Sequence, residues 1–233
     1  MGRSLSRCSR EVAHDNSEPM WTRYFSDRPG PWPLIPVVHL ARTIYHGPLF
    51  AKRIRRLGGP VGSYLEVGVG TGATLKALRR TTGAACSGVD KTALACRLAK
   101  RNAMGCDVLI ADGLLLPFRD ATFDLVYSLG LLEHFPDRKQ RCLLREHARV
   151  ARKTVLLHLP ADVPHLRFLL WLNRTVGGRS GVWADEELFT MAVIREKFPE
   201  LPFRSFFDVL AGAMSYWFVL KPEEILRHVV APR

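Results

Sequence analysis

The segment SYLEVGVGTGATLKAL, residues 63–78, contains three glycines at alternate positions directly after an apolar run. The residues from Ser63 to Val69 have the apolar and β-branched content of a strand that is buried on both faces. From Thr71 onward the apolar spacing becomes helical. Glycines between a strand and a helix allow a ligand to approach the backbone closely, where free N–H groups point out of the helix N-terminus. The segment therefore predicts a loop that holds a nucleotide or a carboxylate.

After this loop the chain alternates between predicted strands and predicted helices. The predicted strands are 63–69, 85–90, 107–111, 124–128 and 154–159, and the predicted helices between them end near residues 80, 102 and 150. Such alternation indicates βαβ units with right-handed crossovers and a parallel sheet. The sequence thus predicts an α/β fold with helices on both faces of the sheet.

The flanking segments complete the expected domain organisation. We expect a polar, poorly ordered segment at 1–31, a helical cover at 37–57, a core at 60–160, an apolar substrate cover at 160–183, a helix at 185–198 and two late strands at 203–210 and 214–220. No internal repeat or low-complexity tract divides the chain. A single domain over residues 32–233 is the simplest description.

The glycines alone leave two ligand classes open. Gly68, Gly70 and Ala73 satisfy the dinucleotide fingerprint G-x-G-x-x-G/A, which favours a nicotinamide enzyme. The same loop is also compatible with S-adenosylmethionine. Asp90 ends the second predicted strand, where an acidic side chain binds ribose hydroxyls in either class.

The segment IADGLLLPFRDATFDLVYSLGLLEHFPD, residues 110–137, separates these two classes. It has an Asp-Gly pair at the third strand tip, a Leu-Pro-Phe loop, a Phe-Asp-Leu-Val strand and a Leu-Glu-His turn. Together with LEVGVGTG, it resembles class I S-adenosylmethionine-dependent methyltransferases of the ubiquinone and menaquinone biosynthesis type (methyltransferase type 11). The resemblance covers about residues 60–160. The Y-x-x-x-K pair of short-chain reductases is absent.

This resemblance implies a fold, a cofactor and a set of binding residues. The implied fold is a Rossmann-like seven-stranded sheet of order 3-2-1-4-5-7-6, mostly parallel with one antiparallel strand. S-adenosylmethionine is the implied methyl donor, in an enzyme of class EC 2.1.1. Glu66 would help to hold its ammonium group, Asp90 its ribose, and Asp112 with the Gly113 N–H its adenine. The full implied cofactor set is Glu66, Gly68, Gly70, Gly72, Asp90, Lys91, Asp112, Gly113, Ser128 and Leu129.

Two acceptor classes and a metal site are disfavoured by motifs that the sequence lacks. SLGL, residues 128–131, stands where nucleobase N-methyltransferases have [DNS]-P-P-[FY], and there is no Pro-Cys nucleophile. Some relatives bind a divalent metal through E-x-x-E-H, but here Gly130 replaces the first glutamate. Glu133 and His134 alone make a poor metal site, so we predict no metal.

Two histidines are the candidate catalytic residues. His134 follows the fourth predicted strand, and His158 ends the fifth, where open α/β sheets bind ligands. A neutral imidazole can remove a proton from a hydroxyl or phenol acceptor at pH 7. We prefer His134 as the general base, because side-chain alternation leaves His158 equally able to face a covering helix. For both histidines, a structural role remains open.

The acceptor is expected to be small and either lipophilic or aromatic. The segment 160–183 and the N-terminal helix would form an apolar lid that suits such a molecule. The lid residues of this segment are Leu166, Phe168, Leu169, Trp171 and Trp183. The same residues would also fit a role as core packed on the sheet edge.

The net charge of +12 keeps a second function open. Basic surfaces attract nucleic acid or anionic membranes, so the alternative is an RNA methyltransferase or a non-catalytic RNA-binding scaffold. The five cysteines include no C-x-x-C pair, which predicts reduced thiols. The expected location is therefore the cytoplasm, with peripheral contact to a membrane or nucleic acid through the basic surface.

Overall fold

The computed structural model describes residues 18–26, 46–176, 187–209 and 214–229. Its strands are β1 (Ser63–Val67), β2 (Ala85–Asp90), β3 (Asp107–Ile110), β4 (Phe123–Leu129), β5 (Ala151–Pro160), β6 (Arg204–Asp208) and β7 (Ser215–Leu220). Its helices are α2 (Glu18–Phe25), α4 (Gly47–Gly58), α5 (Ala73–Thr82), α6 (Ala93–Asn102), the 3-10 helix η2 (Leu132–His134), α7 (Asp137–Val150), α8 (Pro164–Val176), α9 (Met191–Lys197) and α10 (Pro222–His228).

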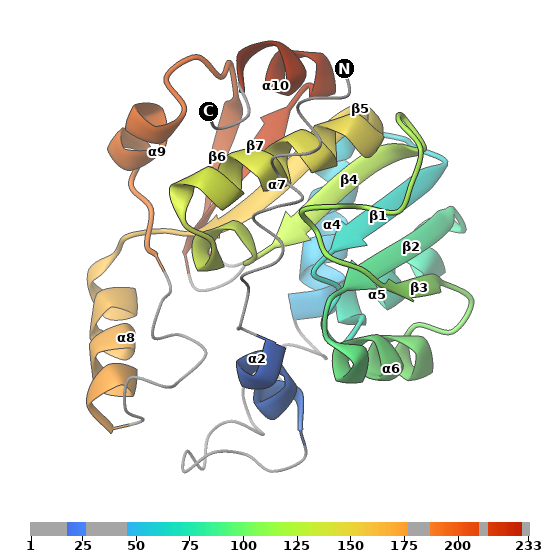
Figure 1. The fold of residues 1–233 in the computed structure, drawn as a ribbon, viewed down its shortest axis with the longest axis horizontal. Coiled ribbons are helices and arrows are strands. Elements are labelled where there is room, and N and C mark those ends of the chain that lie inside the picture. The colour runs from blue at the N-terminus through green and yellow to red at the C-terminus, as the bar shows by residue number, and fades with distance from the viewer. Residues whose placement is uncertain (1–17, 27–45, 177–186, 210–213, 230–233) are drawn as a thin grey trace.

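The strands form one seven-stranded sheet of order β3-β2-β1-β4-β5-β7-β6 (Figure 1). Neighbouring strands from β3 to β5 are parallel, whereas β7 runs antiparallel to both β5 and β6. This arrangement confirms the predicted fold class, including the single antiparallel strand. It also brings the carboxyl ends of β1, β2 and β4 to the same edge, which is where an open α/β sheet binds ligands.

Two apolar cores lie on opposite faces of the sheet. One core joins the sheet to α7, α9 and α10 through Leu143, Ile194 and Ile225. The other joins it to α4, α5 and α6, with Ile54 and Leu75 among its buried side chains. In Figure 1, α7 crosses in front of the sheet, whereas α4 and α5 lie behind it. Helices on both faces match the prediction, because strands in the centre of a parallel sheet are buried on both sides.

The N-terminal segments differ from the prediction. The expected helix 37–57 is described from residue 46, and α4 begins at Gly47. Pro48 lies in its first turn, where the missing N–H costs no helical hydrogen bond. Within the segment 1–31, which was expected to be poorly ordered, Glu18–Phe25 forms α2. Residues 27–45 lie outside the described residues.

The later part of the chain also shows differences. The helix expected at 185–198 is described as the shorter α9, whose Thr190 side chain accepts a hydrogen bond from the Val193 N–H at 3.2 Å. Helix α10 was not predicted. Among the described cysteines, three are free thiols as expected, but Cys142 is disulfide-bonded. Each described helix is too short or too polar to cross a lipid bilayer.

Candidate functional site

A cavity of about 290 Å³ opens at the carboxyl ends of β1, β2 and β4. Its glycine-loop side consists of lining residues within 66–74, 89–92 and 111–113. Its cover side consists of lining residues within 21–25, 46–50 and 129–139. The cavity thus lies where the sequence predicts the cofactor, between the strand tips and two helices from the N-terminal part of the chain.

The glycine loop is held against β2 by its backbone. The N–H groups of Gly68 and Val69 both donate to the Val89 carbonyl at 2.9 Å. Gly70 has a φ of 52°, in the left-handed region that disfavours a side chain, and a Cβ there would lie 3.5 Å from the Phe25 ring. The loop therefore presents bare backbone to the cavity beneath α2.

The third glycine has a different structural role. Gly72 has a φ of 75° and is the N-cap of α5. A Cβ at this position would lie 3.0 Å from the Cα of Ala99 on α6. Gly72 therefore allows two helices to pack closely, and it does not line the cavity. The sequence pattern had grouped it with the cofactor-contacting glycines.

Asp90 lies at the tip of β2 and faces the cavity. Its carboxylate accepts hydrogen bonds from the Gly70 N–H at 3.1 Å and from the Thr92 N–H at 2.9 Å. Burial raises the pKa of this carboxyl group, while the two backbone hydrogen bonds lower it. Lys91 also lines the cavity. Each carboxylate oxygen keeps a second lone pair, so Asp90 can still accept hydrogen bonds from a diol.

Glu66 is 4% exposed and lies on β1 next to the loop. Its Oε2 accepts a hydrogen bond from the Tyr127 hydroxyl at 2.9 Å. Burial is the main cause that raises the pKa of Glu66 to about 8, and the nearby Asp90 carboxylate raises it further, while Tyr127 opposes the shift. With this raised pKa, the Glu66 carboxyl group is mostly protonated and uncharged at pH 7. A cation that enters the cavity favours its ionised form.

The Asp112–Gly113 pair follows β3 and also lines the glycine-loop side of the cavity. The Asp112 carboxylate accepts a hydrogen bond from the Leu114 N–H at 2.8 Å, which closes a tight turn. Gly113 lies between β1 and α7, since a Cβ there would be 2.9 Å from Leu143 and 3.0 Å from Val67.

The two remaining predicted cofactor residues lie next to each other on β4. Leu129 lines the cavity at the end of the strand. Ser128 is buried within the strand and is not a lining residue. Of the predicted cofactor set, the structure therefore brings all but Gly72 and Ser128 to the cavity.

The two candidate bases have different surroundings. His134 ends η2 and lines the cavity, and its ring centroid is 4.9 Å from that of Trp21 in an edge-on arrangement. His158 is buried on the α4 side of β5, with the rings of Phe50 and Trp217 each 4.9 Å away. It does not line the cavity, and Phe50 does. The structure thus brings only His134 to the predicted site.

The turn that carries His134 also carries the remnant of the metal motif. Glu133 is buried and lines the cavity, and Gly130 has a φ of 64°. Within the described residues, no group of three His, Cys, Asp or Glu side chains is arranged to hold a metal ion.

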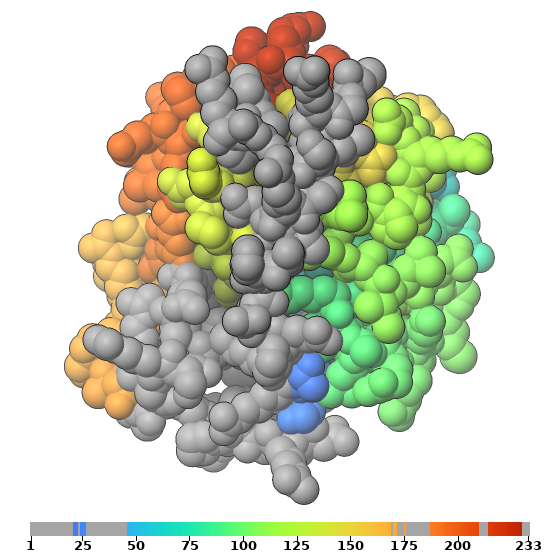
Figure 2. All heavy atoms as spheres, in the orientation of Figure 1, coloured from blue at the N-terminus to red at the C-terminus, as the bar shows by residue number. Residues whose placement is uncertain are grey.

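Of the two segments predicted to cover the site, the N-terminal helix lines the cavity as α4, whereas the segment 160–183 does not, and α2 is an addition. Trp21, Tyr24 and Phe25 of α2 line the cavity, as do Gly47 and Phe50 of α4 and His46, the residue before that helix. None of the described residues of the expected cover 160–183 lines it. Phe168 and Trp171 of α8 are 57% and 58% exposed, and Figures 1 and 2 show α8 at the periphery of the molecule. Trp183 lies outside the described residues.

Little in the local sequence indicates the α2 part of this cover. Helix α2 lies in a segment whose polar composition favoured disorder, and its aromatic residues reach the cavity only through tertiary packing. The three aromatic residues of WTRYF, residues 21–25, stand at i, i+3 and i+4, and this helical spacing is the one local signal that could have indicated the cover.

Comparisons with known proteins agree with this geometry. Residues 65–154 match the family of methyltransferase domains. The bovine protein named "Probable tRNA methyltransferase 9B" is 36% identical over 86 residues, which are 36% of this chain and 18% of that protein. Norajmaline N-methyltransferase of Rauvolfia serpentina is 31% identical over 93 residues, which are 37% of this chain and 31% of that enzyme. This chain therefore spans less than a third of the length of either curated relative.

The fold also resembles solved structures over nearly its whole length. Magnesium protoporphyrin IX methyltransferase of Synechocystis PCC 6803, with bound SAH, superposes with a TM-score of 0.63. The superposition covers 91% of this chain and 99% of that chain at 15% sequence identity. At this identity the resemblance concerns the fold alone.

Proposed function

We propose that this chain, which carries a class I S-adenosylmethionine-dependent methyltransferase domain, methylates a small acceptor with a lipophilic or aromatic surface. S-adenosylmethionine as methyl donor is supported by the methyltransferase-domain match and by the similar folds solved with bound SAH and SAM. The observation that carries the proposal is the composition of the cavity. Three carboxyl groups and the glycine loop lie on one side of it, and aromatic side chains lie on the other.

The glycine-loop side fits the donor in three respects. Glu66 is a buried carboxyl group that would ionise beside the ammonium group of the methionyl part. Asp90 has lone pairs available for the ribose hydroxyls. The Asp112–Gly113 turn offers an acceptor and a donor for the adenine edge. These assignments, like those of Gly68, Gly70, Lys91 and Leu129, follow the family resemblance and their position at the cavity.

The protein's own contribution to the reaction would be positioning and proton removal. The bound donor supplies a methyl group that is already activated on a sulfonium. Trp21 and the other cover residues would hold the acceptor and exclude water. His134 would accept the acceptor's proton, since its ring lines the same cavity at the cover side. We assign His158 no direct contact with the acceptor. In our proposal Phe50, which lines the cavity, separates His158 from the acceptor.

The proposal is tested by binding and by transfer of a labelled methyl group. We expect calorimetry to detect S-adenosylmethionine and S-adenosylhomocysteine but not NADH. We also expect the purified protein to add one methyl mass to a component of an extract of small metabolites. The matched control is the same incubation with S-adenosylhomocysteine in place of the donor. Binding of NADH alone would contradict both the cofactor assignment and the reaction.

The second candidate function is RNA methylation or RNA binding without catalysis. It is favoured by the net charge of +12 and by the name of the bovine relative. Filter binding to RNA across a salt series separates the candidates, because phosphate contacts give a steep salt dependence. Tight binding at physiological salt, together with methyl transfer to RNA, would replace the small-molecule proposal. The aromatic cover favours the small acceptor.

The cellular setting is part of the same proposal. We infer a single domain over residues 32–233 in the cytoplasm, with peripheral contact between its basic surface and an anionic membrane or nucleic acid. Helix α8 supports membrane contact, because it contains no acidic residue and exposes the stacked rings of Phe168 and Trp171. Sedimentation with anionic vesicles tests this, with neutral vesicles as the control. Equal recovery with both would contradict an electrostatic contact.

A further inference from the structure

The segment between β3 and β4, residues 111–122, begins with the Asp112–Gly113 pair and forms no helix or strand of its own. A loop of this length is normally one of the more variable parts of a fold. Here it is fixed by side chains from α7. Two of them, Glu146 and Arg149, do not line the cavity. Their contacts suggest how the predicted adenine-binding turn is held in place.

Glu146 connects α7 to the middle of this segment. Its Oε2 accepts a hydrogen bond from the Leu116 N–H at 2.9 Å. The same carboxylate accepts two hydrogen bonds from Arg149, each at 2.8 Å. Glu146 is buried, so its charge requires these partners.

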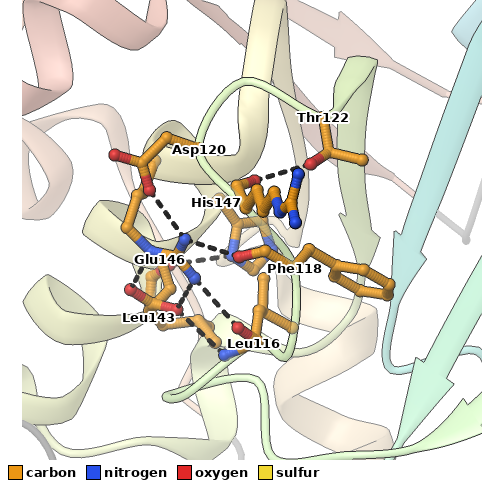
Figure 3. Close-up of polar contacts among 9 residues, drawn as sticks. Leu116, Phe118, Asp120, Thr122, Leu143, Glu146 and His147 are labelled. Carbon is orange, nitrogen blue, oxygen red and sulfur yellow. Dashed lines mark hydrogen bonds and ion pairs between the residues drawn. The ribbon is translucent and has the colours of Figure 1, made fainter.

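Arg149 uses all five of its N–H donors (Figure 3). Two go to Glu146, and the others go to the Leu116 carbonyl at 2.9 Å, the Phe118 carbonyl at 2.7 Å and the Asp120 carboxylate at 2.9 Å. Its own backbone carbonyl accepts from the Ala121 N–H at 2.7 Å. A planar guanidinium can serve five acceptors in fixed directions, whereas a lysine ammonium has only three donors.

The same helix also fixes the start of the segment. Leu143 lies one turn before Glu146 on α7 and packs so closely against Gly113 that a Cβ there would be 2.9 Å away. Between these contacts, Asp112 accepts hydrogen bonds from the Leu114 N–H through its carboxylate and from the Leu115 N–H through its backbone carbonyl. The turn is therefore held at Gly113 and again at Leu116, with few free torsions between them.

We propose that Glu146 and Arg149 are positioning residues for the adenine-binding turn Asp112–Gly113. They touch neither the cofactor nor the acceptor in this proposal, and act by fixing the backbone that follows Asp112. The inference rests on the proposed use of S-adenosylmethionine. The competing interpretation is that the pair stabilises the fold without influence on how the adenine is recognised.

Substitution Arg149→Lys separates these interpretations. It keeps the charge but leaves at least two of the five acceptors without a donor. We expect the affinity for S-adenosylhomocysteine to fall about fivefold, the factor that corresponds to one lost hydrogen bond. We expect the KM for S-adenosylmethionine to rise by a similar factor, while kcat at saturating donor stays within about twofold of the wild type.

A second ligand gives a readout that fold stability alone would not change. In the inosine analogue of S-adenosylhomocysteine, a carbonyl replaces the exocyclic amine that Asp112 would bind. The wild type should prefer the adenosine compound, and Arg149→Lys should reduce this preference. A purely structural pair would lower the melting temperature of the variant but leave the preference of its folded fraction unchanged.

Arg152 provides the matched control. It donates to the Asp124 carboxylate at 2.8 Å and to the Thr122 carbonyl at 3.3 Å, and so holds the far end of the same loop without contact to Leu116. Arg152→Lys should leave the affinity and the ligand preference equal to those of the wild type. Asp120→Ala is the second test variant, since Asp120 is 68% exposed and its removal should not prevent folding. It should weaken S-adenosylhomocysteine binding by about twofold, which corresponds to a fraction of the free energy of one hydrogen bond.

The possible results separate failure of this inference from failure of the proposed function. A wild type that binds no S-adenosylhomocysteine would overturn the proposed function itself. A wild type that binds it, with Arg149→Lys unchanged in affinity and in preference, would overturn only the positioning role. Should Arg149→Lys not fold, Asp120→Ala decides, and wild-type affinity in that variant would overturn the inference.

Discussion

The glycine-loop side of the cavity is formed by neighbouring parts of the chain within residues 66–113, whereas the cover side combines α2, α4 and the turn after β4. On the first side, backbone hydrogen bonds set the geometry, such as those from the loop to Val89 and to Asp90. On the second, side-chain packing sets it, as in the edge-on contact of Trp21 with His134. The two sides therefore differ in what a substitution can disturb.

This difference has a functional consequence. A cofactor site formed by backbone turns suits a donor that every member of an enzyme class shares. A cover formed by side chains can change its acceptor through a few substitutions while the fold stays the same. We expect substitutions on the glycine-loop side to change donor affinity and those on the cover side to change turnover or acceptor affinity.

The largest expected effect belongs to His134 on the cover side. His134→Ala should lower kcat by at least about a hundredfold, because it removes the proposed general base. The affinity for S-adenosylmethionine, measured by calorimetry, should stay within about threefold of the wild type, since loss of a surface contact at this site costs little. His158→Ala is the matched control and should lose less activity, because His158 packs between Phe50 and Trp217 behind the cavity.

Near-full turnover in both histidine variants would contradict the assignment of a protein base. The acceptor would then be an oxygen that is already ionised, or a neutral amine or carbon nucleophile. An equal loss in both variants would instead indicate a structural effect, and circular dichroism would detect it. Either result would remove the proposed difference between the two sides with respect to turnover.

The two sides also differ in how far the sequence predicted them. Strand β2 and the glycine loop were predicted because local residue patterns determine them, such as the end of β2 at Asp90. The strand order came from the family resemblance, since periodicity does not report which strands are neighbours. The position of Gly72 against Ala99 and the position of α2 over Gly70 depend on tertiary packing between distant segments. No local pattern in the sequence specifies such contacts.

The second prediction concerns the donor and the glycine-loop side. Asp90→Ala should weaken the binding of S-adenosylmethionine and S-adenosylhomocysteine by about 1–3 kcal/mol, as the loss of a buried charged hydrogen-bond partner does. Calorimetry measures the affinities, and kcat at saturating donor should change much less than KM. Asp107→Ala is the control, because Asp107 is an exposed aspartate at the opposite end of the neighbouring strand β3. A similar loss in Asp107→Ala would show that the effect is not specific to the cavity.

The third prediction uses the raised pKa of Glu66. Tyr127, Asp90 and the backbone of Leu75 are the groups that act on this carboxyl group, and burial raises its pKa to about 8. Because the pKa of Glu66 in the folded protein exceeds the usual glutamate pKa of 4.5, Glu66 stabilises the ligand-free fold fully below about pH 4.5, and this contribution is lost as the pH rises to about 8. Binding of an ammonium group requires the ionised form. Donor affinity should therefore rise between pH 6 and 7.5, by up to about tenfold per unit.

Calorimetry in two buffers of different ionisation enthalpy would measure the proton that Glu66 releases on binding. The control variant Glu66→Gln keeps an acceptor for the Tyr127 hydroxyl but has no proton to release. It should bind the donor more weakly and with little dependence on pH over this range. Proton release that persists in Glu66→Gln would assign the titration to another group and contradict the proposed role of Glu66.

The smallest expected effect compares a tryptophan that lines the cavity with one that the sequence predicted for the acceptor cover. Trp21 lines the cavity, whereas Trp171 lies exposed on α8 and does not. Trp21→Ala should raise the KM for the acceptor by about three- to tenfold, because it removes part of the apolar surface that the acceptor would bury. Donor affinity should change little, since the glycine loop and Asp90 remain in place. Trp171→Ala should leave both constants unchanged and reduce only the recovery with anionic vesicles. If Trp171→Ala raised the acceptor KM as much as Trp21→Ala, α8 would belong to the acceptor site after all, as the sequence alone predicted.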